Sequence, residues 1–179
     1  MTTLPLPFFF LRHGETDWNR AGLVMGLKDI PLNAEGRTQA AAAANILTEY
    51  GIASIWSSPL GRARETAEIV ASRLGLAVSL IGGLAERNWG IYEGGAASAR
   101  KNKDAAPEGG ESAADFTRRS IAALSEVGGP APALVVAHSG TFRALCRHMN
   151  WPHGAEPVAN AQPLLVTEEG PHPLHNFAL

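Results

Sequence analysis

The chain alternates short apolar runs with segments whose apolar residues recur every three or four positions. Two runs, Phe8–Leu11 and Ala133–Ala137, are unbroken apolar tracts of strand length. Such tracts are typical of strands that are buried on both faces of a parallel sheet. Weaker runs at Ile52–Trp56, Ala77–Ile81 and Pro163–Thr167 predict three further strands, and the last is followed by a Pro- and His-rich tail.

Helical periodicity fills most of the space between these runs. Residues 34–50, 58–74, 112–127 and 141–149 are the predicted helices. Asn33 and Ser58 are the expected N-caps of the first two, and Gly51 and Gly75 are suited to the left-handed positions that end them. The alternation of strands and helices predicts an α/β fold: a single three-layer α/β/α sandwich with a mostly parallel central sheet, forming one domain over residues 1–179.

The segment Gly82–Gly110 is the least regular part of the chain, rich in glycine and alanine with little apolar periodicity. Long loops in compact domains often cover a binding site, so we expect residues 82–110 to form a substrate-covering loop or a small helical excursion. Its basic residues Arg100, Lys101 and Lys103 form either a solvated face or a contact surface for an acidic substrate.

Composition narrows the class of partner. The formal net charge of −2 argues against nucleic acid, because proteins that bind the phosphate backbone usually carry a basic surplus. The apolar tract near the start is too short to span a membrane and lacks a basic region before it. The single cysteine, Cys146, excludes an internal disulfide and is expected to be an inert core thiol. We therefore expect a cytoplasmic protein with no membrane association.

Polar residues with catalytic potential follow several of the predicted strands. Arg12 and His13 come directly after the first apolar tract, and His138 follows the tract at 133–137. In open α/β sheets the carboxyl ends of strands form the ligand-binding edge. Arg62, near the start of the second helix, offers planar donors suited to phosphate, as does Arg12, whereas a neutral histidine nitrogen serves as a base or a nucleophile.

Taken together, the motifs resemble the histidine phosphatase superfamily in its phosphoglycerate-mutase-like branch. The matching segments are LRHGETDWN at 11–19, GLKDIPLN at 26–33, SSPLGRARETA at 57–67, LAERNWGIYEG at 84–94, PEGGES at 107–112, VVAHSG at 135–140 and Asn160-Ala161. They occur in the family's order and cover most of the chain. Two positions depart from the family pattern: Ala137 replaces a common serine, and Ser139 stands where glycine is usual.

The resemblance implies a role for each matching residue. His13 corresponds to the nucleophile that accepts the phosphoryl group, and Glu86 to the acid that protonates the leaving alkoxide. Arg12, Arg62 and His138 correspond to the phosphoryl-binding pocket, with Asn19 and Ser139 as further substrate-binding residues. The expected substrate is a small phosphate ester, with free phosphate as a further ligand. Two guanidiniums and an imidazole can neutralise a phosphoryl group, so neither a cofactor nor a metal ion is expected.

Several alternatives stay open. The expected activity is hydrolysis, because the chain is short for a mutase and the 90–94 and 110–112 segments are phosphatase-like. A phosphoglycerate mutase is the alternative, and Arg87 directly after Glu86 is a mutase-like detail, although a surface ion pair explains Arg87 as well. A non-catalytic phospholigand sensor is a third possibility. Trp18 and Trp89 border the site segments and either pack in the core or line the pocket. His148 and His153 suggest a metal pair but have no third ligand at a suitable spacing.

Overall fold

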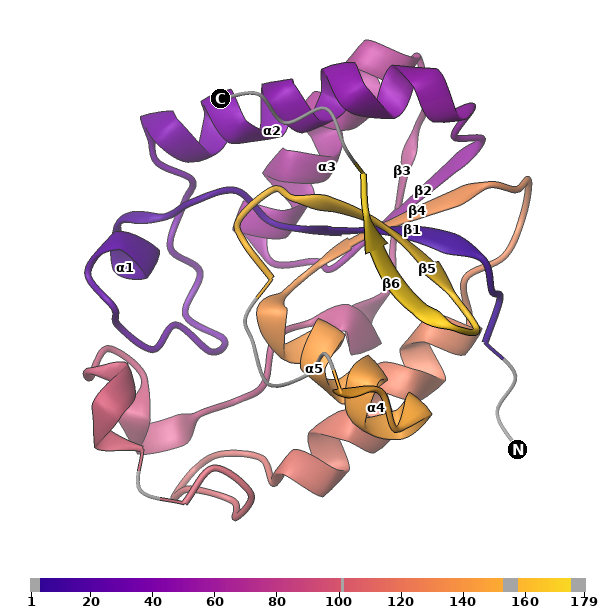
Figure 1. Ribbon diagram of the computed structural model, residues 1–179. Helices are drawn as coiled ribbons and strands as arrows, with labels where there is room; N and C mark the ends of the chain where they lie inside the picture. The colour runs from indigo at the N-terminus through magenta and orange to yellow at the C-terminus, as the bar shows by residue number, and fades with distance from the viewer. Residues whose placement is uncertain (1–3, 101, 153–157, 175–179) are drawn as a thin grey trace.

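In the computed structural model, which describes residues 4–100, 102–152 and 158–174, six strands form one sheet in the order β3-β2-β4-β1-β5-β6 (Figure 1). The strands are β1 (Phe8–Arg12), β2 (Ser54–Ser57), β3 (Val78–Leu80), β4 (Ala133–Ala137), β5 (Pro163–Thr167) and β6 (Gly170–Pro173). Pairing is parallel from β3 through β2 and β4 to β1, and antiparallel from β1 to β5 and from β5 to β6. The predicted α/β class with a mostly parallel sheet is confirmed.

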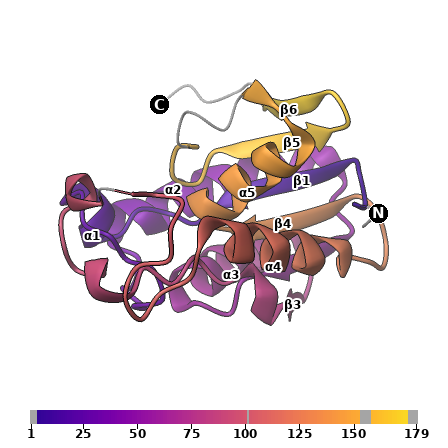
Figure 2. The same cartoon turned by 90° about the horizontal axis from the view of Figure 1, so that it is seen from below.

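Helices cover both faces of the sheet. The α-helices are α1 (Asp17–Arg20), α2 (Ala34–Leu47), α3 (Gly61–Leu74), α4 (Ala113–Ser125) and α5 (Ser139–Met149). Short 3-10 helices are η1 (Thr48–Tyr50), η2 (Gly82–Leu84), η3 (Gly90–Tyr92) and η4 (Ala97–Ala99). Helices α2 and α3 lie on one face and α4 and α5 on the other, as Figures 1 and 2 both show. None of the helices in the described ranges has the length and apolar content needed to cross a bilayer.

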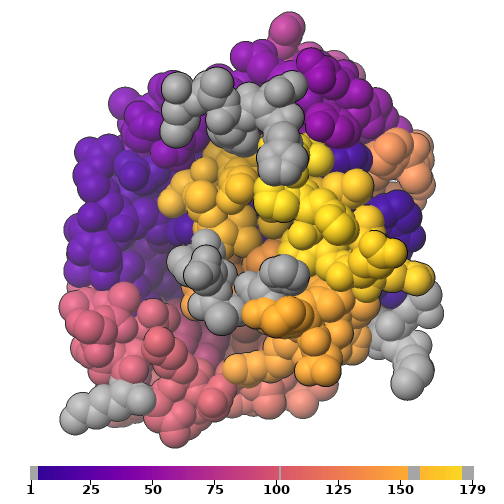
Figure 3. All heavy atoms as spheres, in the orientation of Figure 1, coloured from indigo at the N-terminus to yellow at the C-terminus, as the bar shows by residue number. Residues whose placement is uncertain are grey.

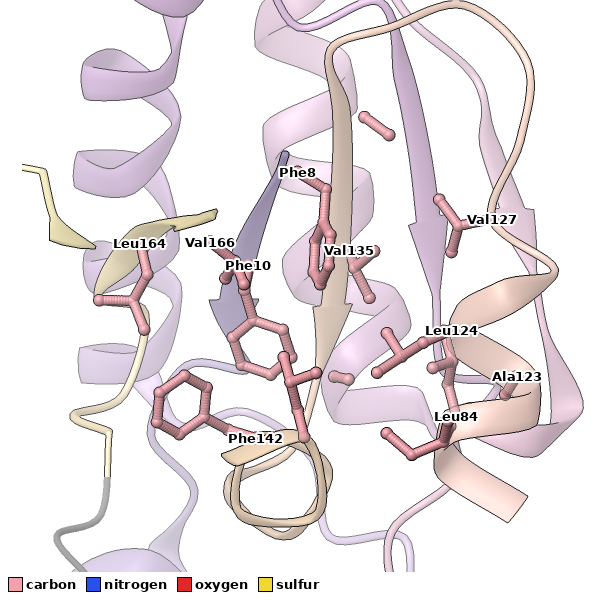
Figure 4. Packing of buried hydrophobic residues seen from close by; sticks show 14 of the residues in the cluster. Phe8, Phe10, Leu84, Ala123, Leu124, Val127, Val135, Phe142, Leu164 and Val166 are labelled. Atoms are coloured by element: carbon pink, nitrogen blue, oxygen red, sulfur yellow. The ribbon is translucent and has the colours of Figure 1, made fainter. Parts of the chain in front are cut away.

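The apolar tract at the start of the chain is buried because β1 lies inside the sheet. Successive side chains of a strand point to opposite faces, so Phe8 and Phe10 join the core under α4 and α5. Phe9 and Leu11 instead join the core under α2 and α3. Figure 4 shows Phe10 beside Phe142 of α5, and their ring centroids are 5.5 Å apart. Because β1 is buried on both faces, its sequence is an unbroken apolar run.

Local details differ from the sequence expectation in three places. Ser58 is not the N-cap of α3, because the helix begins at Gly61 and Leu60 is its N-cap, without a side-chain cap. The Ser58 hydroxyl accepts from the Leu60 amide at 3.3 Å and also contacts His138. Helix α5 begins at Ser139, two residues earlier than expected. The tail after Thr167 contains β6, in which His172 Nε2 lies 3.1 Å from the Thr167 hydroxyl oxygen. The expected caps at Asn33, Gly51 and Gly75 are present.

Strand register carries the chemically active residues to one edge of the sheet. Arg12 of β1 is paired with Ala137 of β4, and the next residue, His13, donates its amide hydrogen to the Ala137 carbonyl at 3.0 Å. On the other side of β4, the Ser58 amide donates to the Val136 carbonyl at 3.0 Å. His13, Ser58 and His138 therefore meet at the carboxyl ends of three neighbouring parallel strands. The expectation that residues 1–179 form one domain stays a prediction.

The chain that leaves β1 passes very close to the start of α2. A Cβ atom on Gly14 would overlap the backbone of Gly36, and a Cβ atom on Gly36 would overlap the backbone of Glu15. The Glu15 carbonyl also accepts a hydrogen bond from the Asn33 amide at 3.0 Å, so neither backbone is free to retreat. These glycines fix the position of the turn that follows His13.

We expect Gly36→Ala to lower the free energy of unfolding by about 1–3 kcal/mol, the usual cost of overpacking, because the overlap is with backbone atoms. The sign is informative, since alanine in a helix normally stabilises by up to about 1 kcal/mol relative to glycine. Urea unfolding measures the difference. Gly82→Ala is the matched control, because nothing lies within 4 Å of a Cβ there. Stabilisation of the Gly36 variant would contradict the close approach.

Candidate active site

Six of the predicted site residues line one cavity of about 200 Å³ beyond the carboxyl ends of β1, β2 and β4. They are Arg12, His13, Asn19, Arg62, Glu86 and Ser139. The segment from 22 to 26 and residues Trp89, Ala97, Arg100 and Arg143 complete the wall. Residues far apart in the sequence meet here: in Figure 3 the pink atoms of the region around residue 95 lie beside the indigo atoms of the N-terminal part.

His13 is buried and its ring is fixed by the backbone. Nδ1 lies 2.7 Å from the Gly14 carbonyl oxygen, an acceptor, so Nδ1 carries the hydrogen and Nε2 keeps its lone pair. Burial lowers the pKa of His13 well below its ordinary value, and the charges of Arg62 and Arg12 lower it further. The imidazole is therefore neutral at neutral pH, with a nitrogen able to attack an electrophile.

Arg62 and Arg12 are held rigidly by backbone carbonyl oxygens. The Arg62 guanidinium is fully buried and donates to the carbonyls of Gly26 at 2.8 Å and Lys28 at 2.9 Å, with Asp29 at 3.7 Å. Arg12 donates to the Val158 carbonyl at 2.7 Å, and burial lowers its pKa to about 10. Two positive charges are therefore positioned against one small cavity.

His138 lies behind the cavity wall rather than on it. Its ring centroid is 5.3 Å from that of His13, and it is fully buried. Nε2 lies 2.8 Å from the Ser58 hydroxyl oxygen, which accepts from the Leu60 amide at 3.3 Å. That leaves the Ser58 hydroxyl hydrogen free to donate to Nε2, which places the His138 hydrogen on Nδ1. Burial is also the main cause that lowers the pKa of His138 well below its ordinary value.

Unpaired donors gather around this site. Among the described residues, five buried side-chain polar atoms have no hydrogen-bond partner, and three of them are Arg12 Nε, Arg62 Nε and His138 Nδ1. Buried polar groups are almost always paired, so three unpaired nitrogen donors in one place need an explanation. Arg12 and Arg62 also line the cavity, so their guanidiniums are the groups that an anion bound there would meet.

Glu86 is the acidic residue that lines the cavity, and backbone amides fix its carboxylate. One oxygen accepts from the Arg87 amide at 2.7 Å, and the other accepts from the Gly140 amide at 3.1 Å. The Glu86 carboxylate is therefore the anionic group that lies at the N-terminus of α5. Gly140 is needed for this contact, since a Cβ atom there would overlap the Glu86 carboxylate.

Asn19 completes the cap of α1 and also lines the cavity. Its Oδ1 accepts from the Thr16 amide at 3.2 Å, completing the capping box of α1, and from Asn160 Nδ2 at 3.3 Å. Its own Nδ2 is left as a donor for the cavity. Asn160 Nδ2 also donates to the His13 carbonyl at 2.9 Å, so the Asn160 motif, weak as a sequence signal, supports the turn after β1.

Arg143 is the main residue that sequence reasoning missed. It lines the cavity and donates to the Ser139 hydroxyl at 2.6 Å, one helical turn away on α5. Arg100 lines the same cavity, with its guanidinium 4.4 Å from the centroid of the Trp89 ring. Of the two tryptophans considered, Trp89 therefore lines the pocket. A signal existed in the chain: Arg143 is four residues after Ser139, and residues at that spacing share a helix face.

Arg87 does not form the surface ion pair weighed for it. Its side chain is buried, and its three nitrogens donate to the carbonyls of Glu111, Lys103 and Ala105 at 2.5 to 2.9 Å. It therefore anchors the 82–110 segment from inside. That segment is also tied to the loop after α1, because Glu93 accepts from the amides of Leu27 and Lys28 at 2.9 and 3.2 Å. The small helical excursion expected at 82–110 corresponds to η2, η3 and η4.

The remaining candidates lie away from the cavity or outside the described residues. Cys146 is buried, and burial raises the pKa of its thiol to about 11, as suits an inert core residue. His148 is exposed on α5, and His153 lies outside the described residues, as does Lys101. Within the described part of the chain, no three His, Cys, Asp or Glu side chains are grouped so that they could hold a metal ion.

A family model described as "Histidine phosphatase superfamily (branch 1)" matches residues 8–160. The chain belongs to the histidine phosphatase superfamily. Among curated relatives of this histidine phosphatase is a protein named "Probable phosphoglycerate mutase GpmB" from Escherichia fergusonii, 44% identical over 88 residues. That match covers 49% of this chain and 41% of the relative, so the chain spans less than half of the curated relatives' length.

Solved histidine phosphatase structures match over nearly the whole chain. The protein TTHB049 from Thermus thermophilus is 32% identical with a TM-score of 0.79, covering 97% of this chain and 100% of that one. The mycobacterial glucosyl-3-phosphoglycerate phosphatase, solved with VO3, is 30% identical with a TM-score of 0.76, covering 94% of this chain and 96% of that one. The fold and the family are therefore shown, and the superfamily is enzymatic.

The lowered pKa values of His13 and His138 predict acid-sensitive stability. Each histidine is neutral in the folded protein but takes up a proton near pH 6.5 when unfolded, so its contribution to stability is complete above pH 6.5 and is lost as pH falls below it. Each histidine contributes a slope approaching about 1.4 kcal/mol per pH unit to the free energy of unfolding in that range.

Urea unfolding between pH 7.5 and 5 should show a smaller slope of the free energy of unfolding against pH in His138→Gln than in the wild type. His148→Gln, altered on the exposed face of α5, should keep the wild-type slope, and an unchanged slope in His138→Gln would contradict the assignment.

Proposed function

We propose that this histidine phosphatase hydrolyses small phosphate monoesters through a phosphohistidine intermediate on His13. The observation that carries the proposal is the state of the His13 ring: neutral, fixed through Nδ1 by the Gly14 carbonyl, and set in one cavity with two buried arginines. A neutral imidazole beside guanidiniums is suited to attack a phosphorus atom whose oxygens those guanidiniums bind.

In the first half-reaction, His13 Nε2 forms a bond to phosphorus as the ester P–O bond breaks. Arg12, Arg62 and the Asn19 amide hold the phosphoryl oxygens, while His138 packs against the His13 ring from behind the cavity wall. The alkoxide that leaves is a strong base, so it needs a proton. Glu86 is the carboxyl group on the cavity wall and supplies that proton.

In the second half-reaction, a water molecule attacks phosphorus and the P–N bond breaks. The Glu86 carboxylate takes a proton from this water, which restores the acid for the next turnover. His13 returns to its neutral state and inorganic phosphate leaves. Charge neutralisation by two arginines makes a metal ion unnecessary for either step, so we propose a metal-independent enzyme without a cofactor. Residues 82–110, which supply Glu86, Trp89 and Arg100 to the cavity wall, are proposed to cover the bound substrate.

A phosphoglycerate mutase is the second candidate, supported by the name of the curated relative that is 44% identical over 88 residues. A mutase shares the first half-reaction but returns the phosphoryl group to a bound product instead of to water. Product analysis separates the two: hydrolysis releases inorganic phosphate, whereas a mutase keeps the amount of phosphate ester constant.

We expect His13→Ala to lower the rate of p-nitrophenyl phosphate hydrolysis by about 1,000-fold or more, because among the described residues that line the cavity no other is a histidine. The rates are measured in EDTA with no added metal ion, and rapid acid-free quenching with mass spectrometry locates the phosphohistidine. The matched control is His148→Ala, exposed on α5, which should behave as the wild type. Wild-type activity that requires a divalent ion, or a phosphohistidine that forms elsewhere, would overturn the proposal.

Glu86→Gln tests the proton donor. We expect it to slow phosphorylation by alkyl phosphates far more than phosphorylation by p-nitrophenyl phosphate, because nitrophenolate leaves without a proton. Glutamine has one acceptor oxygen for the two amides that Glu86 now binds, so both rates fall to some extent and their ratio is the readout. Single-turnover rates give that ratio.

The control for this comparison is Glu68→Gln, which removes a carboxylate paired with Arg64 on the exposed face of α3 and should leave the ratio unchanged. Equal losses for the two esters in Glu86→Gln would show that Glu86 holds the site in shape without donating a proton.

A further inference from the structure

The turn at residues 83–88, which carries Glu86, is held by one side chain of α4. Arg119 Nη1 donates to the carbonyls of Gly83 at 2.8 Å and Ala85 at 3.0 Å. Its Nη2 makes a longer hydrogen bond to the Glu86 carbonyl at 3.4 Å. A single planar guanidinium therefore fixes the backbone that leads into Glu86.

The other edge of the same guanidinium binds Glu111. Arg119 Nε and Nη2 donate to the two carboxylate oxygens of Glu111 at 3.0 and 2.8 Å, and a bidentate pair of this kind has a fixed relative orientation. Glu111 in turn holds the chain that follows Glu86. Its amide donates to the Asn88 carbonyl at 2.9 Å, and its carbonyl accepts from Arg87 Nε at 2.8 Å. The Arg119–Glu111 pair therefore contacts the turn on both sides of Glu86.

The turn also lies directly on α4. A Cβ atom on Gly83 would be 2.7 Å from the Ala123 Cβ, closer than two such atoms approach, and Ala123 is one helical turn after Arg119. Helix α4 packs along α5 (Figure 2), whose Gly140 amide donates to the Glu86 carboxylate at 3.1 Å. The seat of the turn on α4 therefore decides whether the Glu86 carboxylate meets α5.

Stability alone is a weak reason for such a fixed ion pair. The side chains of Arg119 and Glu111 are 32% and 18% exposed, and ion pairs in contact with water add little to the free energy of unfolding. A proton donor, in contrast, must lie within hydrogen-bond distance of the leaving oxygen, and a displacement of about 1 Å can slow a reaction about 100-fold. The pair is therefore better explained by what it does to the position of Glu86.

We propose that Arg119 and Glu111 are positioning residues for Glu86: as one ion-paired unit they hold the 83–88 turn on α4, so that the Glu86 carboxyl group faces the leaving oxygen. Neither residue is among the described residues that line the His13 cavity, so both act through Glu86 and not on the substrate. This inference rests on the proposed function, in which Glu86 protonates the leaving alkoxide.

The test measures single-turnover phosphorylation by benzyl phosphate and by p-nitrophenyl phosphate, two esters of similar size. We expect Arg119→Gln to slow the reaction of benzyl phosphate about tenfold or more relative to that of p-nitrophenyl phosphate, because only the alkoxide needs a well-placed proton donor. The ratio of the two rates is the readout, since a general loss of structure lowers both rates alike. Arg118→Gln removes the neighbouring, exposed arginine of α4 and is the matched control, which should keep the wild-type ratio.

Glu111→Gln should change the ratio in the same direction. The double variant should fall no further than Arg119→Gln, because two residues that act as one unit are not additive. Arg119→Lys keeps the charge but loses the fork of donors, so it should restore the ratio only in part. Glu111→Gln is also the second variant should Arg119→Gln fail to fold.

Glu86→Gln, measured with the same two esters, separates this inference from the proposed function. If Glu86→Gln changes the ratio but Arg119→Gln and Glu111→Gln lower both rates equally or not at all, the positioning role is overturned and the phosphatase proposal stands. If Glu86→Gln itself leaves the ratio unchanged, Glu86 is not the proton donor, and the proposed mechanism fails together with this inference.

Discussion

The parallel pairing of β1 with β4 is the constraint on which the rest of the site depends. In this register Arg12 lies opposite Ala137, so each strand delivers its histidine to the same place at its carboxyl end. A shift by one residue would turn the alternate side chains of β1 to the wrong face and separate the histidines. The register is secured from both faces, because Phe8 and Phe10 fill one core and Phe9 and Leu11 fill the other. The hydrophobic pattern of the first strand therefore also determines the geometry of the active site.

Placing cations at that edge creates an electrostatic problem that the surrounding loops resolve. A buried guanidinium without partners would be very costly, but Arg62 is met by the carbonyl oxygens of Gly26 and Lys28. Those carbonyls belong to the loop after α1. The Glu93 carboxylate accepts hydrogen bonds from backbone amides of this loop, so the position of Arg62 depends on the 82–110 segment. Burial lowers the pKa of His13, and the same cations lower it further, so the ring stays neutral. Nucleophile, cations and loop thus form one connected arrangement.

The sequence predicted the strands and the phosphoryl-binding residues better than the contacts between loops. Apolar tracts indicate buried strands directly, and Arg12, His13 and Arg62 lie in motifs of fixed spacing, so their meeting follows from the topology. Ser58 was misassigned as a helix cap because Ser58-Pro59 is typical of a helix start, whereas α3 begins at Gly61. The Ser58 hydroxyl accepts from the Leu60 amide and also contacts His138, a partner that only the tertiary structure reveals. Arg87 looked like a surface or substrate residue because its partners are backbone carbonyls, which no side-chain pattern records.

The cavity around His13 and a second cavity of about 400 Å³, between the 82–110 segment, α4 and α5, are built largely from different parts of the chain. The wall around His13 draws on strand ends and the first turn of α3. The wall of the second cavity comes from the 82–110 segment, α4 and α5. A fold divided in this way can keep one reaction while its substrate changes, which fits a superfamily whose similar members carry the names of a mutase and of a phosphatase. Ser139 lies at the boundary: its backbone starts α5 beside His138, and its hydroxyl holds Arg143. A single residue at that position therefore connects the helix start beside His138 to the wall of the second cavity, which Arg143 lines.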